Sequence, residues 1–271
     1  MNWKRGSIAL LLSILQPGAG QIYNRNCWTA ILYLSFVPCS LFVARELRLL
    51  HTFGGLVTFA IVNLPLSFLV VAEAARSGLK SDPSMIWPAR KRLPLVLAII
   101  LAALNFAGLQ SGFYVNKVLG IHGYLIVAES MAPTLVPGDR IAVDDLAYRP
   151  RSPDREEVIV VTNNEPNSGP LVKRVIAVGG DTLTIDGAGI MLNGQLLREP
   201  HLVGSFTATG SYGFGIYKIP PGQFFVMGDN RGESFDSRSP EFGAVDTGRI
   251  RGKPLYTYFS KDWSRVGKRI E

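Results

Sequence analysis

The sequence predicts an N-terminal multi-span α-helical membrane region, residues 1–115, followed by a mostly antiparallel β domain, residues 116–271. Three observations lead to this fold class. Long apolar runs are confined to the first part. The second part holds short β-prone runs separated by turn residues, with no helical periodicity. The charge is also uneven, because residues 1–115 carry ten Lys and Arg against three Asp and Glu, whereas the remainder carries eighteen of each sign.

This distribution decides what the net charge of +7 means. A nucleic-acid-binding protein would gather its basic residues on a folded polar face with aromatic residues between them. Here the excess lies in links between apolar runs, the pattern that orients membrane helices. Both cysteines, Cys27 and Cys39, lie in the first part, and no Cys/His set has zinc spacing, since the only histidines are His51, His122 and His201. We expect no nucleic-acid partner, no metal and no cofactor.

The first apolar run, residues 7–15, is too short to cross a bilayer core, which needs about 20 helical residues. It breaks at Gln16–Gln21, where Pro-Gly-Ala-Gly is a turn signal rather than a cleavage site. We therefore expect residues 7–22 to form a re-entrant or interfacial segment and not a cleavable signal peptide. Three runs of spanning length follow, at about residues 28–44, 54–75 and 93–114. The alternative, core helices of a soluble protein, is disfavoured because such helices average about 10–14 residues.

The links between these runs predict an orientation. Residues 76–92 contain five basic residues and one acidic residue, which favours the cytoplasmic side. The third span then runs outward. We expect a multi-pass protein of the inner (cytoplasmic) membrane with residues 116–271 on the extracytoplasmic side.

Seven strands are expected in the second part. A Pro-Gly turn at residues 137–138 leads into a strand that ends at Val143. The other strands are expected at Glu157–Thr162, Leu171–Val178, Thr182–Ile185, Ile190–Leu192, Gln223–Met227 and Arg249–Phe259. The segment Asp186–Gly189 is typical of a hairpin turn, and Asn163–Pro170 of a polar loop.

The stretch Val127–Leu135 carries a candidate nucleophile, Ser130. Pro133 and Pro137 fix φ and remove backbone donors, so we expect a stiff, extended loop that presents the serine hydroxyl. The alternative is an ordinary serine on a surface loop. No histidine is well placed to activate Ser130, and the Gly-x-Ser-x-Gly motif is absent, so a base must come from elsewhere in the sequence.

Lys173 is the candidate base. It stands beside Arg174 in an apolar strand, where neighbouring residues point to opposite faces, so one of the two should point inward. Burial lowers the pKa of a lysine and can make it a base near neutral pH. A surface Lys-Arg pair on a half-exposed strand is the alternative.

A third stretch, Met227–Arg238, is dense in side chains that bond locally to backbone. We expect a polar network that braces the lysine, and a generic turn-rich loop is the alternative. The candidate members are Asp229, Asn230, Ser234, Asp236 and Arg238.

Together these motifs resemble the bacterial type I signal peptidases, the Ser/Lys-dyad endopeptidases of peptidase family S26. The shared boxes are Ser130-Met-x-Pro-Thr-Leu135, Gly138-Asp-x-x-x-Val143, Lys173-Arg174 before Gly179-Gly-Asp181, and Gly228-Asp-Asn-Arg231 through Ser234-x-Asp-Ser-Arg238.

The resemblance implies a membrane-anchored serine endopeptidase whose β domain removes signal peptides from exported preproteins, cleaving after small residues. It implies that Ser130 is the nucleophile, that Lys173 is the general base and that Ser234 helps to orient the lysine. It further implies a supporting ion pair of Asp236 and Arg238, and a box, Asp229-Asn230, that shapes the site. The partners expected are preprotein signal peptides, the lipid bilayer and the secretion translocon.

Two departures from the family pattern keep alternatives open. Ala128 stands where many bacterial members have a serine whose hydroxyl contributes to the oxyanion hole, which leaves the backbone N–H of Ser130 as the expected donor. Losing one donor can lower the rate ~10²–10³-fold. The stretch Gln16–Asn24 and the three spans also differ from the usual one- or two-span anchor. A specialised processing peptidase with few substrates, or a catalytically silent membrane scaffold that binds exported segments, would also fit.

Overall fold

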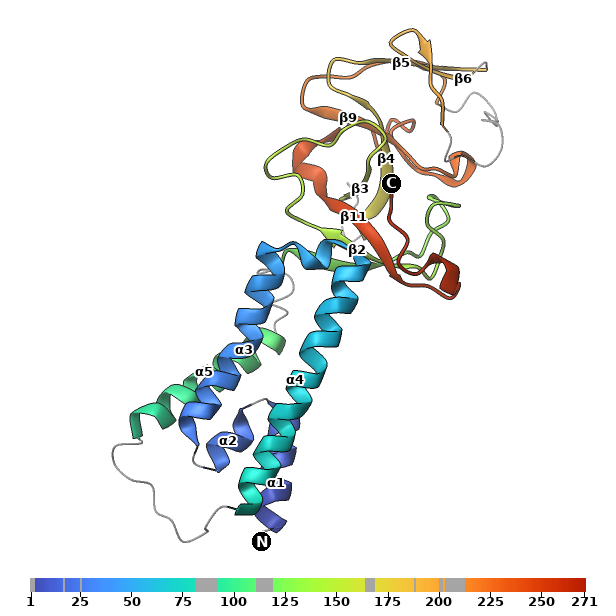
Figure 1. The fold of residues 1–271 in the computed structure, drawn as a ribbon. Helices are drawn as coiled ribbons and strands as arrows, with labels where there is room; N and C mark the ends of the chain where they lie inside the picture. Colours follow the sequence, from blue (N-terminus) through green and yellow to red (C-terminus); the bar gives the residue numbers. More distant parts are fainter. Residues whose placement is uncertain are drawn as a thin grey trace. The chain divides into compact units, whose positions relative to one another are not determined.

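The computed structural model describes the chain except for residues 1–2, 17, 25, 81–91, 111–118, 164–168, 188, 200–201 and 203–212. The chain divides into two compact units, Met1–Gly120 and Ile121–Glu271. Helices form the first unit and β strands the second (Figure 1).

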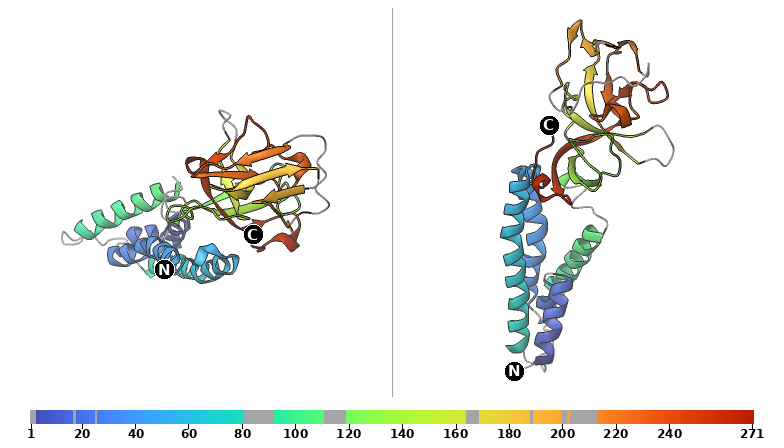
Figure 2. Two further views of the ribbon diagram at one scale, coloured as in Figure 1. Left: turned by 90° about the horizontal axis from the view of Figure 1, so that it is seen from above. Right: turned by 90° about the vertical axis from the view of Figure 1, so that its right-hand side faces the viewer.

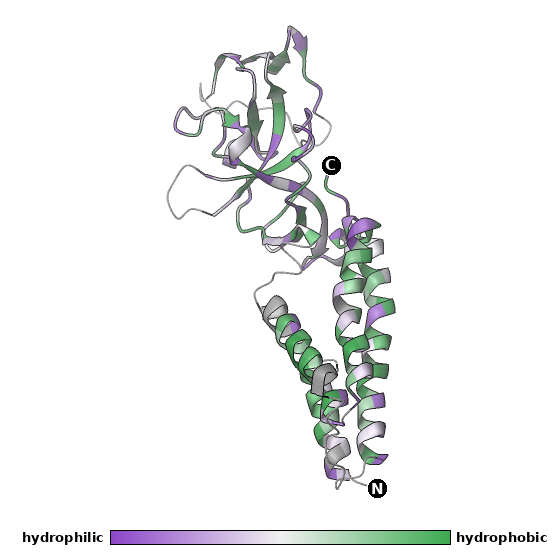
Figure 3. Cartoon of the chain, turned by 90° about the vertical axis from the view of Figure 1, so that its left-hand side faces the viewer, coloured by the Kyte–Doolittle hydropathy of each residue, from purple (hydrophilic) through white to green (hydrophobic). Residues whose placement is uncertain are grey.

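The first unit is helical throughout its described length. Its elements are α1 (Trp3–Leu15), α2 (Ala19–Tyr23), α3 (Cys27–Glu46), the 3₁₀ turn η1 (Leu49–His51), α4 (Phe53–Lys80) and α5 (Arg92–Gln110). Hydrophobic residues dominate the long helices (Figure 3). Pro38 and Pro65 lie inside α3 and α4 without ending them, as happens in membrane helices when other groups satisfy the freed carbonyls.

Two of these helices, α3 and α4, are long and apolar enough to cross a membrane by length and composition. The described apolar part of α5 is shorter, Val96–Asn105, and residues 111–114 of the expected third span lie outside the described residues. Asn105 is buried, and its side-chain amide donates to the carbonyl of Leu34 in α3 at 3.1 Å. The described residues therefore contain two candidate spans, and the third expected span lies partly outside them.

The stretch Gln16–Asn24 forms a junction between helices. The Gln21 side chain is buried, and its amide donates to the Val70 carbonyl of α4 at 2.9 Å and to the Glu73 carboxylate at 3.0 Å. A Cβ on Gly20 would lie 2.2 Å from the carbonyl oxygen of Ala9, so only glycine allows α1 and α2 to approach this closely. Within the expected segment of residues 7–22, α1 ends at Leu15 and α2 begins at Ala19, on either side of the predicted turn.

The second unit contains two antiparallel sheets, seen from two further sides in Figure 2. The seven-stranded sheet has the order β1-β2-β11-β3-β4-β9-β10, and the four-stranded sheet has the order β7-β6-β5-β8. The strands are β1 (Ile121–Leu125), β2 (Arg140–Asp144), β3 (Val158–Val161), β4 (Leu171–Val178), β5 (Thr182–Asp186), β6 (Gly189–Leu192), β7 (Gln195–Leu196), β8 (Gly215–Lys218), β9 (Gln223–Met227), β10 (Val245–Asp246) and β11 (Ile250–Phe259). The predicted antiparallel β domain is confirmed.

The sequence misses strands β1, β7, β8 and β10. Two of them have only two residues each, and β1 reads Ile-His-Gly-Tyr-Leu, which lacks the β-branched alternation that marks the other strands. Its register is set by its partner β2, with His122 opposite Val143. Tertiary pairing therefore decides this strand.

Strand β4 lies inside the large sheet, between β3 and β9. Apolar clusters cover both faces of this region: one contains Val158 and Val160 of β3, and another contains Ile159 and Val161 of the same strand. All four residues of β3 are buried. In the middle of β4, from Lys173 to Ala177, side chains are thus buried on both faces.

Candidate active site

Strand β4 carries Lys173 and Arg174, and both side chains are buried, with 1% and 2% of their surface exposed. The sequence predicts that only one of the two points inward, and this prediction is wrong. Neighbouring residues of a strand point to opposite faces, and both faces of the sheet are covered here. Each charge therefore needs partners inside the protein.

The stretch Val127–Leu135 is a series of turns and not the extended loop that the sequence predicts. The Leu135 amide donates to the Met131 carbonyl at 2.8 Å, and the Ala132 amide donates to the Glu129 carbonyl at 2.9 Å. Met131 and Leu135 are fully buried in one apolar cluster. Bringing these two side chains into the same cluster requires a compact turn, which leaves Ser130 half-buried at its edge.

Lys173 and Ser130 are in direct contact. The Lys173 Nζ donates to the Ser130 Oγ at 2.9 Å, although the two residues are 43 positions apart. Burial lowers the pKa of Lys173 from its ordinary value of 10.5 to about 8; the Asp236 carboxylate opposes this shift and the Arg238 guanidinium adds to it. About a tenth of the lysine is therefore a neutral amine at pH 7 and about half of it at pH 8.

Asp229 neutralises Arg174 on the other face of β4. The Arg174 guanidinium donates to both Asp229 oxygens, at 2.8 and 2.7 Å, and neither side chain is more than 3% exposed. The hydroxyl of Thr134, in the Ser130 turns, donates to the same carboxylate. This ion pair therefore connects the sheet to the stretch that carries Ser130.

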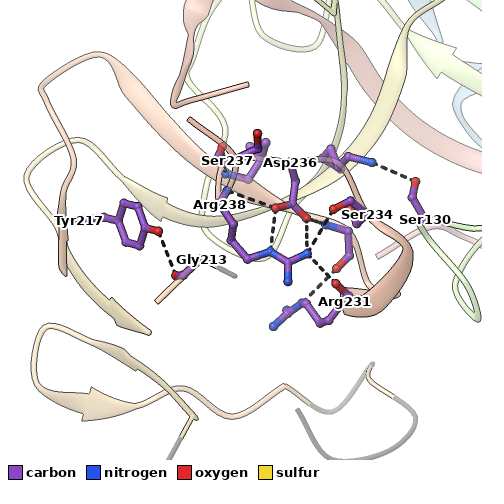
Figure 4. A network of polar contacts seen from close by, with 12 residues as sticks. Ser130, Gly213, Tyr217, Arg231, Ser234, Asp236, Ser237 and Arg238 are labelled. Atoms are coloured by element: carbon purple, nitrogen blue, oxygen red, sulfur yellow. Dashed lines mark hydrogen bonds and ion pairs between the residues drawn. The ribbon is translucent and has the colours of Figure 1, made fainter. Parts of the chain in front are cut away.

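Asp236 and Arg238 form a second buried ion pair, in which the carboxylate faces the guanidinium (Figure 4). The Arg238 Nε donates to Asp236 Oδ1 at 2.8 Å and Nη2 donates to Oδ2 at 2.9 Å. Asp236 also accepts from the Gly228 amide at 3.0 Å. The pair thus closes the Met227–Arg238 loop on itself.

The same loop touches the backbone of Ser130. The Asn230 amide donates to the Ser130 carbonyl at 3.0 Å. A Cβ on Gly228 would lie 2.3 Å from that carbonyl oxygen, far inside van der Waals contact, so the position requires glycine. Asp229-Asn230 thus contacts the serine through backbone and not through the Asn230 side chain.

One expected site residue, Ser234, lacks the contact that the family resemblance implies. Ser234 is buried, and its Oγ lies beside Gly228 with no hydrogen-bond partner among the described residues, so the expected contact with Lys173 is not formed. The Ser234 hydroxyl occupies the space that a side chain at position 228 would fill. Ala128 is exposed next to the turns and supplies no hydroxyl.

Arg265 holds the turns of Val127–Leu135 in place, and no pattern in the sequence predicts this contact. Arg265 donates to the carbonyls of Thr134 and Pro133 at 2.8 and 3.2 Å, and it pairs with buried Asp139 at 2.7 Å. Burial would raise the pKa of Asp139, but hydrogen bonds from Arg265 and from the Val136 amide hold it below its ordinary value. Arg265 follows Asp139 by 126 positions, and only the folded chain brings them together.

The site contains the Ser130 hydroxyl and the Lys173 amine within hydrogen-bond distance of each other. Two buried ion pairs, Arg174–Asp229 and Asp236–Arg238, lie next to them. Among the residues that the structure describes, no group of three His, Cys, Asp or Glu side chains could hold a metal ion. The site is thus equipped for nucleophilic acyl transfer with lysine in the place that histidine takes in other serine hydrolases.

Comparison with known proteins gives consistent matches. The family model described as "Signal peptidase, peptidase S26" matches residues 93–259. The signal peptidase I of Bacillus licheniformis is 31% identical over 171 residues, covering 61% of this chain and 85% of the relative. That of Mycobacterium tuberculosis (strain ATCC 25618 / H37Rv) is 35% identical over 211 residues, covering 58% and 69%. A crystal structure of a signal peptidase I from Enterococcus faecalis V583 aligns with a TM-score of 0.32 and 26% identity, over 38% of this chain and 97% of that chain.

The curated relatives define the class of protein, a serine endopeptidase of the signal peptidase I type. The family model matches more than half of the residues, and the chain belongs to the signal peptidase family, peptidase S26.

Proposed function

We propose that this chain removes signal peptides from exported preproteins with a Ser130–Lys173 dyad, cleaving after small residues. The 2.9 Å contact between Lys173 Nζ and Ser130 Oγ carries the proposal, because a buried amine at this distance can take the hydroxyl proton. The substrate class follows from the relatives, which are named signal peptidases.

The reaction proceeds by acyl transfer in two halves. As Ser130 Oγ attacks the scissile carbonyl carbon, the neutral Lys173 amine accepts the hydroxyl proton, and it returns that proton to the leaving amine when the C–N bond breaks. Water then attacks the acyl carbon while Lys173 accepts a proton from it, and the ester C–O bond breaks as Lys173 returns that proton to Ser130 Oγ, which releases the new carboxyl end. Both halves begin with a neutral lysine, which a pKa of about 8 makes available.

The tetrahedral intermediate needs donors for its oxyanion, and the Ser130 backbone N–H is the donor proposed here. Ala128 lacks the hydroxyl that many relatives place nearby, a loss that can lower the rate ~10²–10³-fold. This residue favours the second candidate, a specialised processing peptidase with few substrates. The two candidates differ in how many preproteins depend on the enzyme.

The first test replaces Ser130 with alanine. Cleavage should be abolished, because the attacking oxygen is gone, and an acylating serine-directed inhibitor that labels wild-type protein should leave the variant unlabelled. Comparing the N-termini of proteins in membrane extracts of wild-type and variant cells then counts the substrates: many uncleaved preproteins indicate a general enzyme and a few indicate a specialised one. Unchanged cleavage in the variant, or an unlabelled wild-type serine, would refute the dyad.

We also propose that the chain is an inner-membrane protein with α3, α4 and residues 93–114 as spans and the β domain outside. The two candidate spans and the five basic residues in 76–92 support this arrangement. It would bring the β domain to the bilayer surface where exported chains emerge and where the secretion translocon is an expected partner. Protease added to spheroplasts should digest a tag at the C-terminus; a tag digested only after lysis would reverse the orientation.

A further inference from the structure

Glu199 links the segment after the small sheet to the loop of the active site. It follows β7, and its carboxylate pairs with the Arg231 guanidinium, 32 positions later, through two N–O contacts. Nη1 and Oε2 are 2.8 Å apart. The side chains are only 6% and 9% exposed, so the pair is shielded from water. A bidentate pair in this setting fixes the guanidinium plane as well as its charge.

Arg231 in turn holds the backbone of Gly228 in place. Its Nε donates to the Gly228 carbonyl at 3.0 Å, and its own carbonyl accepts from Arg238 Nη2 at 2.7 Å (Figure 4). On the other side, the Gly228 amide donates to Asp236. The peptide groups of Gly228 are therefore held by two ion pairs, Glu199–Arg231 and Asp236–Arg238.

The position of Gly228 in turn limits where Ser130 can lie. The Ser130 carbonyl accepts from the Asn230 amide at 3.0 Å, and it lies so close to Gly228 that a Cβ there would be 2.3 Å away. If the Gly228–Asn230 backbone moves, the Ser130 backbone must move with it, and the 2.9 Å contact of its hydroxyl with Lys173 changes.

We infer that Glu199 is a positioning residue for the reaction, which acts through Arg231 and Gly228 on the place of Ser130. The inference rests on the proposed Ser130–Lys173 chemistry. Without the Glu199 carboxylate, the buried guanidinium loses both of its contacts with that group, and its hydrogen bond to the Gly228 carbonyl is no longer held in place. A misplacement of about 1 Å at the nucleophile can cost about 10²-fold in rate.

The experiment measures peptide cleavage by the full chain in detergent, with Glu199 replaced by Gln or Asp. Titration with an acylating inhibitor, continued until labelling is complete, gives the number of reactive serine sites in each preparation. Unfolded protein is then not mistaken for a lower kcat. We expect kcat per titrated site to fall roughly 10- to 100-fold in Glu199→Gln with an unchanged KM, and to recover in part in Glu199→Asp. Glu241→Gln, which removes an exposed carboxylate, should leave kcat unchanged.

Coupling to Arg231 is tested by the double variant. If Glu199 acts through Arg231, Glu199→Gln combined with Arg231→Gln should be no slower per site than Arg231→Gln alone. A Glu199→Gln enzyme with fewer titrated sites but wild-type kcat per site would overturn the inference, as would additive effects in the double variant. The Ser130→Ala variant distinguishes failure of the proposed function from failure of this inference. If Ser130→Ala still cleaves substrate, the proposed function is refuted. If Ser130→Ala is inactive but Glu199→Gln has wild-type kcat per site, only the inference about Glu199 is refuted.

Discussion

Replacing Lys173 with methionine is expected to abolish cleavage and, at pH 7, to make the β domain more stable. Loss of a catalytic base from a serine hydrolase lowers kcat by about 10⁴-fold or more. Wild-type activity should rise as pH passes about 8, where the buried ammonium loses its proton. A profile that is flat between about pH 6.5 and 9.5 would contradict Lys173 as the base.

The stability gain follows from linkage. Because the folded pKa of Lys173 is lowered from 10.5 to about 8, the unfolded chain holds this proton more tightly than the folded one. Below pH 8 the buried Lys173 ammonium lowers the free energy of unfolding by about 3 kcal/mol, at about 1.36 kcal/mol per pKa unit. The cost shrinks as pH rises from 8 to 10.5 and is absent above that. The methionine variant should therefore gain about 3 kcal/mol at pH 7 and little near pH 10.5.

Native-state hydrogen exchange of the β4 amides in the full chain measures this difference at both pH values. Lys268→Met, which removes an exposed lysine, is the matched control and should change neither activity nor exchange. A methionine variant at position 173 that cleaves substrate, or that gains no protection at pH 7, would show that Lys173 is not the buried base described here.

Replacing Asp229 with alanine is expected to cost about 3–5 kcal/mol of β-domain stability, because the buried Arg174 guanidinium loses its carboxylate partner and keeps only the main-chain oxygens of Glu156 and Glu271. The pair is 3% and 0% exposed, so solvent screens it little. Thr134 loses its acceptor at the same time. Activity should fall as well, since the stretch that carries Ser130 loses its contact with Asp229 through Thr134.

The matched control is Asp154→Ala. Asp154 pairs with Arg151, but its side chain is 80% exposed, and exposed pairs contribute about 0–1 kcal/mol. Adding Arg174→Met to Asp229→Ala removes the orphaned charge and should restore part of the stability. Chemical unfolding followed through the β domain measures all four proteins. Equal losses in Asp229→Ala and Asp154→Ala would mean that the buried pair contributes no more than a surface pair.

Much of the β domain can be predicted because its strands are local patterns. Val158–Val161 and Leu171–Val178 are apolar β-branched runs, and Asp186–Gly189 carries the glycines that a hairpin needs. The helices follow from length and hydrophobicity in the same way. Prediction fails where the pairing of one strand with another decides the structure, as in β1; the contacts of the α1–α2 junction with α4 likewise come only from the folded chain.

Candidate site residues can be named from sequence when a residue type is chemically out of place, such as Lys173 in an apolar strand. Its neighbour Arg174 looks equally out of place, yet no local pattern shows that both faces of β4 are covered. Glu199 and Arg265 look like ordinary charged residues of loops. Their roles depend on Arg231 and Asp139, which lie 32 and 126 positions away.

The sequence by itself determined the division into a helical and a β part and most strand positions, and it made Ser130 and Lys173 candidates, because periodicity, charge and residue type are local properties. The tertiary structure alone decided that these two side chains meet at 2.9 Å, that the Ser130 stretch is compact, and that Glu199 and Arg265 brace it. Those contacts depend on sheet order and on burial from both faces. Burial turns a lysine into a neutral amine and makes each remote ion pair necessary.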